Sequence, residues 1–414
     1  MKNLAKILLI LFIVFSFAIY INPTLLRNIV LKVTPDELRA KIKDFVLGED
    51  FLDKYFYEIN YNEKKLPELQ FQSVKVNSLD VGDIVGKSVK SHFGGNYKTA
   101  FIESFNDDGL MIISNSGKIQ ILDDLNKKKV IEMKTNIPEN IRVVGSEKKD
   151  DKNIFLSIYE NNKDISECDL LTILKGNIDN TDKTINFTSI FNSEECISGG
   201  LGGELALAKN NKLFFTTSAS AKFKDLAQDD NSVFGKVIEI NLEDNSFRIF
   251  SKGHRNPQGL MVTKDNYLIA TEHGPYGGDE VNNIIYGKNY GWPISSYGEP
   301  YSFKKEKGKF SLKKNHVFQN FEEPIFAFIP SIGISKIIEI PDGFSDKMTN
   351  NFFITSLNRK SIYRTKFDKN FEKIIFMEEI RLDGRVRDAV FIKNLNSFVF
   401  YLEDISKLVI IKSS

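Results

Sequence analysis

The sequence predicts an all-β fold, and two observations carry this prediction. From about residue 70 the chain repeats one unit, namely a strand, a turn rich in Asp, Asn, Gly or Lys, and a second strand of β-branched and aromatic residues. The composition of the 414 residues agrees, because 34 Phe and 14 Tyr beside only 11 Pro suit a strand-rich core with many buried rings.

The second strands of these units begin at Gly109, Asn153, Lys212, Tyr267, Asn351 and Ser397. Six units of this size are typical of four-stranded blades arranged around an axis, so we expect a six-bladed β-propeller over residues 69–414. A pair of large β-sandwiches is the alternative that the same pattern allows. The longest interval, from Tyr267 to Asn351, is where we expect functional loops.

Residues 1–23 are predicted to be a targeting segment. Lys2 and Lys6 precede an apolar run over 7–21. The run is either a signal peptide cut after Ala18 or an uncleaved membrane anchor, and its continuation past the possible cut favours the anchor. In both cases we expect a periplasmic or extracytoplasmic protein. If the run is an uncleaved anchor, we also expect the protein to be membrane-anchored.

Residues 24–68 are expected to form a short helical spacer. Thr34 is a suitable N-cap, Pro35 suits the first turn, and Asp36 and Glu37 suit the positive end of a helix.

Charge and cysteine content limit the possible partners and the compartment. The formal net charge is +1, which gives no nucleic-acid footprint. Cys168 and Cys196 form either a disulfide in an oxidising compartment or two buried thiols.

Two segments combine residues that suit ligand binding. Residues 253–260 place an arginine, an amide and a constrained turn just before a strand, which suits a planar anionic ligand. Residues 272–280 and 287–293 place carboxylates beside Gly/Pro turns that expose carbonyl oxygens, as a hard cation such as Ca²⁺ requires. A solvated turn is the alternative for either segment alone.

Together these segments strongly resemble one family, the PQQ-dependent soluble aldose (glucose/sorbosone) dehydrogenases. The resemblance rests on Arg-Asn-Pro-Gln-Gly at 255–259, Glu-His-Gly-Pro at 272–275 and Asn-Tyr-Gly-Trp-Pro at 289–293. Residues 227–236 and the Arg-x-Arg-Asp element at 385–388 agree in order. The resemblance extends from about residue 90 to the C-terminus.

The resemblance implies roles for two sets of residues. The cofactor-binding set for PQQ is Arg255, Asn256, Tyr301, Pro330, Ser331, Arg385 and Arg387. The metal set consists of the carbonyls of Gly274 and Pro275 for the cofactor's Ca²⁺, with Glu280 and Tyr290 for a second, structural Ca²⁺.

The sequence departs from the family where proton transfer is expected. Gly200 stands at the position of the family's catalytic histidine, so the catalytic residue is unknown and Glu204 is a possible substitute, with Glu194 and Glu195 as further candidates. Asn358, beside Arg359, stands in place of a PQQ-contacting lysine, and no glutamine is found near 140–145.

The other histidines and the tryptophan are expected to be structural. His254 and His273 lie inside the matched motifs, while His92 and His316 are expected at the surface or in packing. Trp292 is expected to pack rather than to stack on a cofactor.

These residues predict a PQQ- and calcium-dependent oxidoreductase acting on an aldose sugar or related alcohol. Its electron acceptor, a quinone or a cytochrome, is left open. Two alternatives from other classes remain: a catalytically silent extracytoplasmic binding module, and a calcium-dependent ester or lactone hydrolase, the latter by fold analogy alone.

Overall fold

Strands dominate the part of the chain that the computed structural model describes, which is residues 74–85, 89–90, 96–125, 129–161, 168–299 and 316–413. All of these residues belong to one compact unit. The predicted targeting segment and helical spacer, residues 1–68, lie outside them. Within the described ranges, no helix is long and apolar enough to cross a bilayer.

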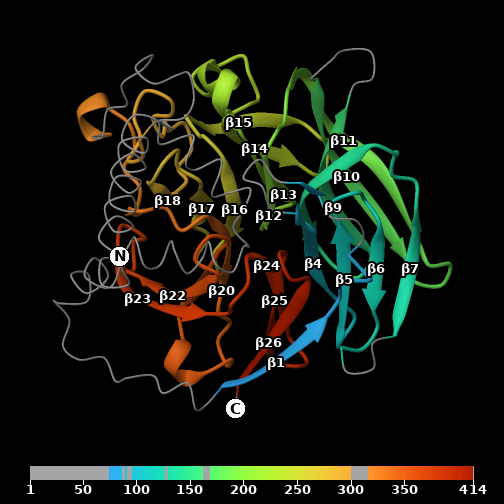
Figure 1. The fold of residues 1–414 in the computed structure, drawn as a ribbon. Coiled ribbons are helices and arrows are strands. Elements are labelled where there is room, and N and C mark those ends of the chain that lie inside the picture. Colours follow the sequence, from blue (N-terminus) through green and yellow to red (C-terminus); the bar gives the residue numbers. More distant parts are fainter. Residues whose placement is uncertain are drawn as a thin grey trace, which may run out of the picture. The chain divides into compact units, whose positions relative to one another are not determined.

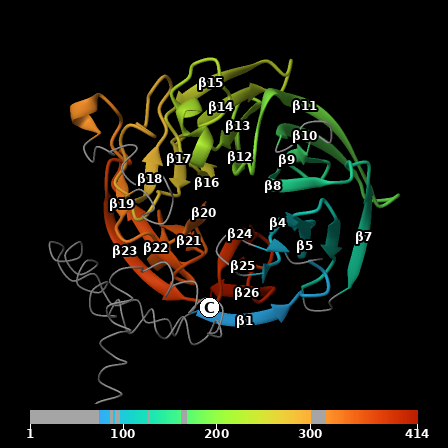
Figure 2. The same cartoon turned by 45° about the horizontal axis from the view of Figure 1, so that its top comes forward.

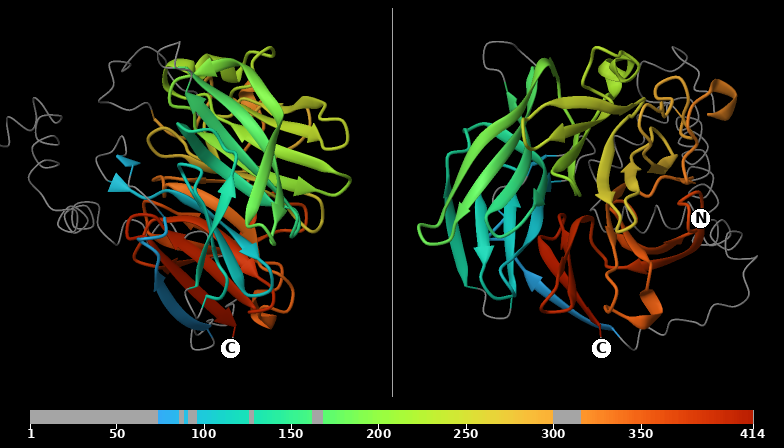
Figure 3. Two further views of the ribbon diagram at one scale, coloured as in Figure 1. Left: turned by 90° about the vertical axis from the view of Figure 1, so that its right-hand side faces the viewer. Right: turned by 180° about the vertical axis from the view of Figure 1, so that it is seen from behind.

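The strands follow one another around the unit in sheets that share one strand order (Figure 1). One eight-stranded sheet contains two sets of four consecutive strands. The first set is β4 (Ala100–Phe105), β5 (Gly109–Ser114), β6 (Ile119–Leu122) and β7 (Val130–Thr135). The second set is β8 (Ile141–Lys148), β9 (Asn153–Asn161), β10 (Asp169–Asp179) and β11 (Thr184–Ile197). The two sets meet where β7 pairs in parallel with β11. The pair β10–β11 is the longest of the fold and is seen from behind in Figure 3.

Three four-stranded sheets follow in chain order. They consist of β12 (Gly202–Ala208), β13 (Lys212–Thr217), β14 (Lys236–Asn241) and β15 (Phe247–Lys252); β16 (Pro257–Val262), β17 (Leu268–Glu272), β18 (Asp279–Asn283) and β19 (Phe326–Phe328); and β20 (Ile334–Glu339), β21 (Phe352–Ser356), β22 (Ser361–Phe367) and β23 (Ile374–Arg381).

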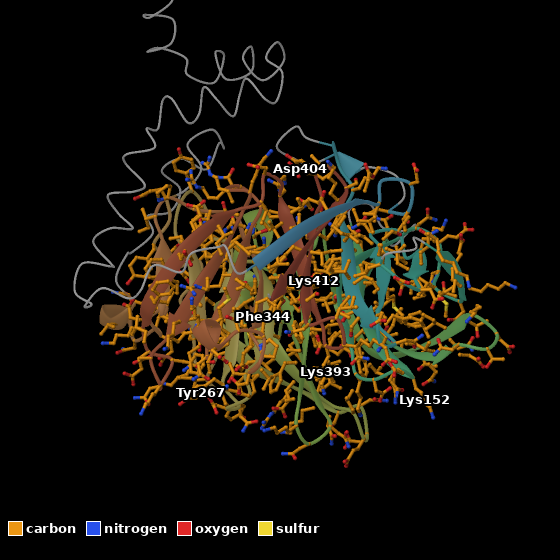
Figure 4. All side chains as sticks on the ribbon, turned by 90° about the horizontal axis from the view of Figure 1, so that it is seen from below. Lys152, Tyr267, Phe344, Lys393, Asp404 and Lys412 are labelled. Carbon is orange, nitrogen blue, oxygen red and sulfur yellow. A yellow bond between two sulfur atoms is a disulfide. The ribbon has the colours of Figure 1, made fainter. Side chains whose placement is uncertain are left out.

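The last sheet unites the two ends of the described chain. It contains β24 (Val386–Ile392), β25 (Ser397–Leu402) and β26 (Lys407–Ser413), and β1 (Val74–Asp80) completes it by antiparallel pairing with β26. Figure 4 shows Lys412 of β26 beside the β1 ribbon. The remaining elements are the short pair β2 (Val89–Lys90) and β3 (Asn96–Tyr97) and the 3₁₀ helices η2 (Ala221–Ala227), η3 (Val317–Gln319) and η4 (Asp346–Met348).

The innermost strands form a closed ring. β4, β8, β12, β16, β20 and β24 contact one another in this order, and β24 contacts β4 again. Figure 2 shows these strands around a common centre. This is the architecture of a β-propeller, as the sequence predicts.

Apolar side chains between neighbouring sheets explain the strand pattern. The second strands β5, β13, β17, β21 and β25 are almost entirely buried, because both faces of each sheet pack on neighbouring sheets. The predicted second strands are confirmed, with Tyr267 and Asn351 each one residue ahead of the observed start.

Cys168 and Cys196 form a disulfide at the start of the β10–β11 pair. This settles the alternative of two thiols in favour of the bond.

Candidate functional site

The innermost strands share an irregularity near their first residues. β8, β12, β16, β20 and β24 each carry a register shift against the next strand, whereas β4 pairs with β5 without one. The extra residue is Gln258 in β16 and Arg387 in β24. Bulges redirect side chains and are common beside functional sites, so this end of the ring is the place to look for one.

The two bulged residues meet across the ring. Arg387 Nη1 donates to Gln258 Oε1 at 3.1 Å, and Gln258 Nε2 donates to Asn256 Oδ1 at 3.0 Å. On the other side, Glu403 accepts hydrogen bonds from Arg387 Nε at 2.7 Å and from Arg385 Nε at 2.9 Å. We call these five residues the arginine network. It brings together three of the predicted PQQ-binding residues, Asn256, Arg385 and Arg387, from two separate sheets.

Electrostatics hold the network in its charged form. Glu403 is buried, and although burial opposes ionisation, Arg387 and Arg385 lower the pKa of its carboxyl below the ordinary value. Arg385 also lies over the ring of Tyr97, 4.3 Å from the centroid. In the described ranges, no hydrogen bond involves the Nη atoms of Arg385, so this guanidinium keeps donors for a ligand.

Glu272 of β17 fixes the loop of Arg255 and Asn256 through hydrogen bonds to its backbone. Glu272 Oε1 accepts the backbone N–H groups of Arg255 and Asn256, the latter at 3.2 Å. Arg255 Nη1 donates to the carbonyl of His273 at 2.8 Å, and its guanidinium lies 5.4 Å from the ring of Trp292. The loop is therefore fixed by its backbone, and the side chain of Arg255 is aimed by its neighbours.

Next to this loop, the side chains of Ser251, His254 and Glu272 form a buried series of hydrogen bonds. His254 Nδ1 lies 3.0 Å from Glu272 Oε2, and its Nε2 lies 2.8 Å from Ser251 Oγ. All three residues are buried, and the imidazole stacks on Tyr290 at 4.6 Å. The arrangement has the order of a Ser-His-Glu triad, but its burial gives it a structural role, as the sequence predicts for His254.

Three of the four predicted metal residues line one small cavity. Gly274, Glu280 and Tyr290 border a cavity of about 10 Å³, together with Glu272 and Arg255. This is about the volume that one water needs. Burial, and then the charge of Glu272, raise the pKa of Glu280 well above its ordinary value. Two carboxyls beside a small void suit a cation, although no group of three or more His, Cys, Asp or Glu able to hold a metal is found among the described residues.

Asp279 connects two of the predicted loops. Its Oδ1 accepts the backbone N–H of Gly274 at 3.0 Å, and its Oδ2 accepts those of Gly333 at 2.7 Å and Ile334 at 3.0 Å. The loop that carries Gly274 and the loop that carries Ser331 are thus held together by one buried carboxylate.

The predicted site is not complete in the structure. Pro275 is buried and Pro330 is exposed, while Tyr301 lies outside the described residues. Arg359 forms an ion pair with Glu379 at 3.7 Å.

The ring of Tyr159 fills the space beside Gly200, the residue for which the sequence predicts loss of the family's histidine. A Cβ on Gly200 would overlap the ring of Tyr159. Arg142 lies over the same ring at 5.2 Å, donates to the carbonyl of Gly200 at 2.5 Å, and lies 3.6 Å from Asp169. Residue 200 therefore has no room for a side chain in this packing.

The three candidate substitute bases lie in different settings. Glu194 is exposed, and Glu195 accepts hydrogen bonds from Val233 N at 2.7 Å and Ser232 Oγ at 2.5 Å. Glu204 is buried and forms an ion pair with Lys336 of β20. Only Glu204 belongs to an innermost strand.

The sequence also predicts structural roles for Trp292, His316 and His92. Trp292 is buried in an apolar cluster and donates to the carbonyl of Ala219 at 2.6 Å, so it packs as predicted. His316 is also buried, and His92 lies outside the described residues.

Sequence reasoning missed several residues of this site, among them Gln258, Glu403, Lys336 and Tyr159. Gln258 lies inside the Arg-Asn-Pro-Gln-Gly motif, and this position was a signal that could have been used. The other three carry no local signal, since each acts through partners on other sheets.

Comparison with known proteins identifies the family of the chain. Residues 100–410 match the family model described as Glucose / Sorbosone dehydrogenase. The chain belongs to this family. An aldose sugar dehydrogenase of Escherichia coli is 30% identical over 200 residues, which are 44% of this chain and 53% of that protein. The chain thus matches about half the length of this relative.

Solved structures share the fold of this family member. The crystal structure of the soluble aldose sugar dehydrogenase from Escherichia coli in its apo form gives a TM-score of 0.67 at 22% identity, covering 82% of this chain and 100% of that one. The PQQ-bound aldose sugar dehydrogenase from Streptomyces coelicolor gives 0.57 at 16% identity, covering 82% and 98%.

Proposed function

We propose that this protein is a PQQ-dependent oxidoreductase that oxidises an aldose sugar or a related alcohol. The observation that carries the proposal is the arginine network, because it joins Asn256 to Arg385 and Arg387 at the end of the ring where the strands bulge. We count the eight-stranded sheet as two blades, which gives a six-bladed propeller.

The residues present fit a planar, carboxylate-bearing ligand. Arg385 and Arg387 bring two positive charges against the single carboxylate of Glu403 in the arginine network, and Arg255 lies next to Asn256 in the chain. Guanidinium groups favour paired hydrogen bonds to carboxylates. Ser331 Oγ is buried and lacks a hydrogen-bond partner in the described ranges, so it is available to a ligand at this edge.

Each residue then has a task in binding and orientation. When bound, PQQ supplies a quinone that takes up the hydride of the alcohol carbon. Arg385 and Arg387 bind carboxylates, and Asn256 orients the ligand through its side-chain amide. Glu272 keeps the loop of Arg255 in place by accepting its backbone amides.

We also propose calcium in two places. The carbonyls of Gly274 and Pro275 would bind one ion, and Glu280 with Tyr290 a second. The fit of the second is supported by the buried carboxyl of Glu280 and by Asn282 Oδ1, which is buried without a hydrogen-bond partner among the described residues. A cation beside Glu280 would remove the cost of ionising it.

Export is a separate proposal. The N-terminal apolar run would direct the chain across a membrane and anchor it there, with a quinone or cytochrome as electron acceptor. The Cys168–Cys196 bond supports an oxidising compartment, where such bonds persist.

One observation favours the binding-module alternative. The ring of Tyr159 fills the space beside Gly200, so the family's histidine position carries no proton acceptor. A silent module predicts PQQ or sugar binding without turnover. The hydrolase alternative gains no support from the ring centre, where Lys336 already supplies a positive charge among the acids.

The test is a titration of the purified protein with PQQ, in Ca²⁺ and in chelator, followed by quinone absorbance and melting temperature. We expect binding in wild type, a loss of at least tenfold in affinity in Arg387→Ala, and unchanged affinity in Arg248→Ala, whose guanidinium lies over Tyr286 away from the network. No spectral or thermal change in wild type would refute the PQQ proposal. Dye reduction with a sugar panel then separates the dehydrogenase from the silent module.

A further inference from the structure

A cluster of charged side chains occupies the centre of the ring. We call Glu103, Glu147, Glu204, Lys336 and Asp388 the axial cluster; each comes from a different innermost strand. Only β16 contributes no titratable residue, and it carries Gly259 at this level.

Lys336 contacts two members of the axial cluster directly. Its Nζ forms an ion pair with Glu204 and lies 3.7 Å from Asp388 Oδ1. Asp388 Oδ2 accepts the backbone N–H of Ile102 at 2.8 Å. Glu103 accepts from Ser146 Oγ at 2.6 Å. Glu204 and Asp388 are almost fully buried, whereas Glu103 and Glu147 are half-buried.

The cluster has more acids than bases, which makes it able to hold protons. Four carboxyls face one ammonium group. Burial raises the pKa of Glu204 to about 8, and burial together with the charge of Glu103 raises that of Glu147 to about 8. Against burial, Glu204 and Asp388 raise the pKa of Lys336 well above its ordinary value. Lys336 therefore stays charged, and the carboxyls exchange the protons.

The cluster adjoins the arginine network. Glu204, Lys336 and Asp388 are each the third residue of their strand, and Arg387 and Gln258 are each the second. Ser335 Oγ donates to the carbonyl of Arg387 at 2.7 Å. The charged residues of the axial cluster thus lie one position further along their strands than Arg387 and Gln258, which belong to the proposed cofactor site.

We propose that Glu204, with the axial cluster behind it, accepts the proton that the substrate hydroxyl loses during oxidation. This rests on the proposed function. The C–H bond of the alcohol carbon breaks with its electron pair passing to the quinone, which is reduced. The O–H bond breaks, its proton goes to the Glu204 carboxylate, and a C=O bond forms in the oxidised sugar.

The proton then leaves the axial cluster for solvent. Glu103 and Glu147 are the half-buried members of the same cluster, so we expect the proton to reach solvent through them. No other acceptor stands at residue 200, because Tyr159 fills that space. The axial cluster at the centre of the ring thus accepts the proton that residue 200 has no side chain to accept.

The first measurement is made on cofactor-free protein. In ¹³C-glutamate NMR, the carboxyl signal missing from Glu204→Gln should titrate near pH 8. Glu103→Gln should move that midpoint to lower pH, because it removes a like charge, and Lys336→Gln should move it to higher pH. A Glu204 midpoint near its ordinary value of 4.5, unmoved by either variant, overturns the proposal.

The second measurement is the pre-steady-state reduction of bound PQQ by saturating aldose. We expect Glu204→Gln to bind PQQ as wild type does but to reduce it ~10²–10⁴-fold more slowly, and Glu204→Asp to recover part of the rate. Glu239→Gln, in β14 of the same sheet and paired with Lys212 at 2.8 Å, is the matched control.

The two proposals fail in different ways. If wild type binds no PQQ, the proposed function and this inference both fall. If wild type reduces PQQ and Glu204→Gln does so at the same rate and with the same pH profile, only the inference falls.

Discussion

Arg387 and Glu403 are joined by two hydrogen bonds, at 2.7 and 3.2 Å, with the carboxylate fully buried. Because Glu403 also binds Arg385, it is the anion that allows two guanidinium groups to lie side by side at the start of β24.

Removal of this anion should destabilise the protein strongly. Glu403→Ala leaves two largely buried cations without their partner, so we expect the free energy of unfolding in urea to fall by about 3–5 kcal/mol. Glu132→Ala removes an exposed ion pair with Lys118 and should cost less than about 1 kcal/mol. Equal losses in the two variants would contradict this account.

Stability should fall as the pH rises from about 5 to 8. Glu204 has a pKa near 8 in the folded protein against an ordinary value of 4.5, so the folded state binds more protons between these values. Its contribution is complete below pH 4.5 and is lost as the pH rises from there toward about 8, by at most ~1.4 kcal/mol per pH unit. Urea unfolding across this range measures the slope, and Glu204→Gln should flatten it; an unchanged slope would refute the assignment.

Loss of the disulfide should loosen the loop that carries Gly200. The bond joins residues 28 apart, and a loop of this size is worth about 3–4 kcal/mol. The double variant Cys168→Ser/Cys196→Ser, compared with wild type in thermal unfolding, should show this loss. Faster amide exchange at Gly199, whose N–H donates to Asp169 Oδ2 at 2.9 Å, should accompany it; protection equal to that of wild type would argue against the coupling.

Gly200 and Tyr159 should behave as a pair. Gly200→Ala would overlap the tyrosine ring and cost about 1–3 kcal/mol. Tyr159→Leu in the same chain should recover part of that cost. The test is a double-mutant cycle by urea unfolding, and strict additivity of the two changes would show that they do not touch.

Local pattern was enough to predict much of the fold. The runs at 109–114, 212–217 and 397–402 are apolar and β-branched because each lies between two neighbouring sheets, and buried strands of this kind are visible in sequence. The loop of Arg255 was found because its residues are adjacent in the chain.

Residues that act through distant partners were not predictable. Glu204 meets Lys336, 132 positions away, and Asp388 binds the backbone of Ile102 across 286. The bulges that place Gln258 opposite Arg387 depend on strand pairing, which no local pattern specifies.

The pairing of β1 with β26 has a consequence for biosynthesis. This sheet lacks one strand until residues 407–413 have left the ribosome and paired with residues 74–80. Until that moment β1 and β25 each present an open edge to any other extended chain. We therefore expect substitutions that weaken the β1–β26 pairing to slow maturation of the protein more than insertions at exposed turns such as 243–245.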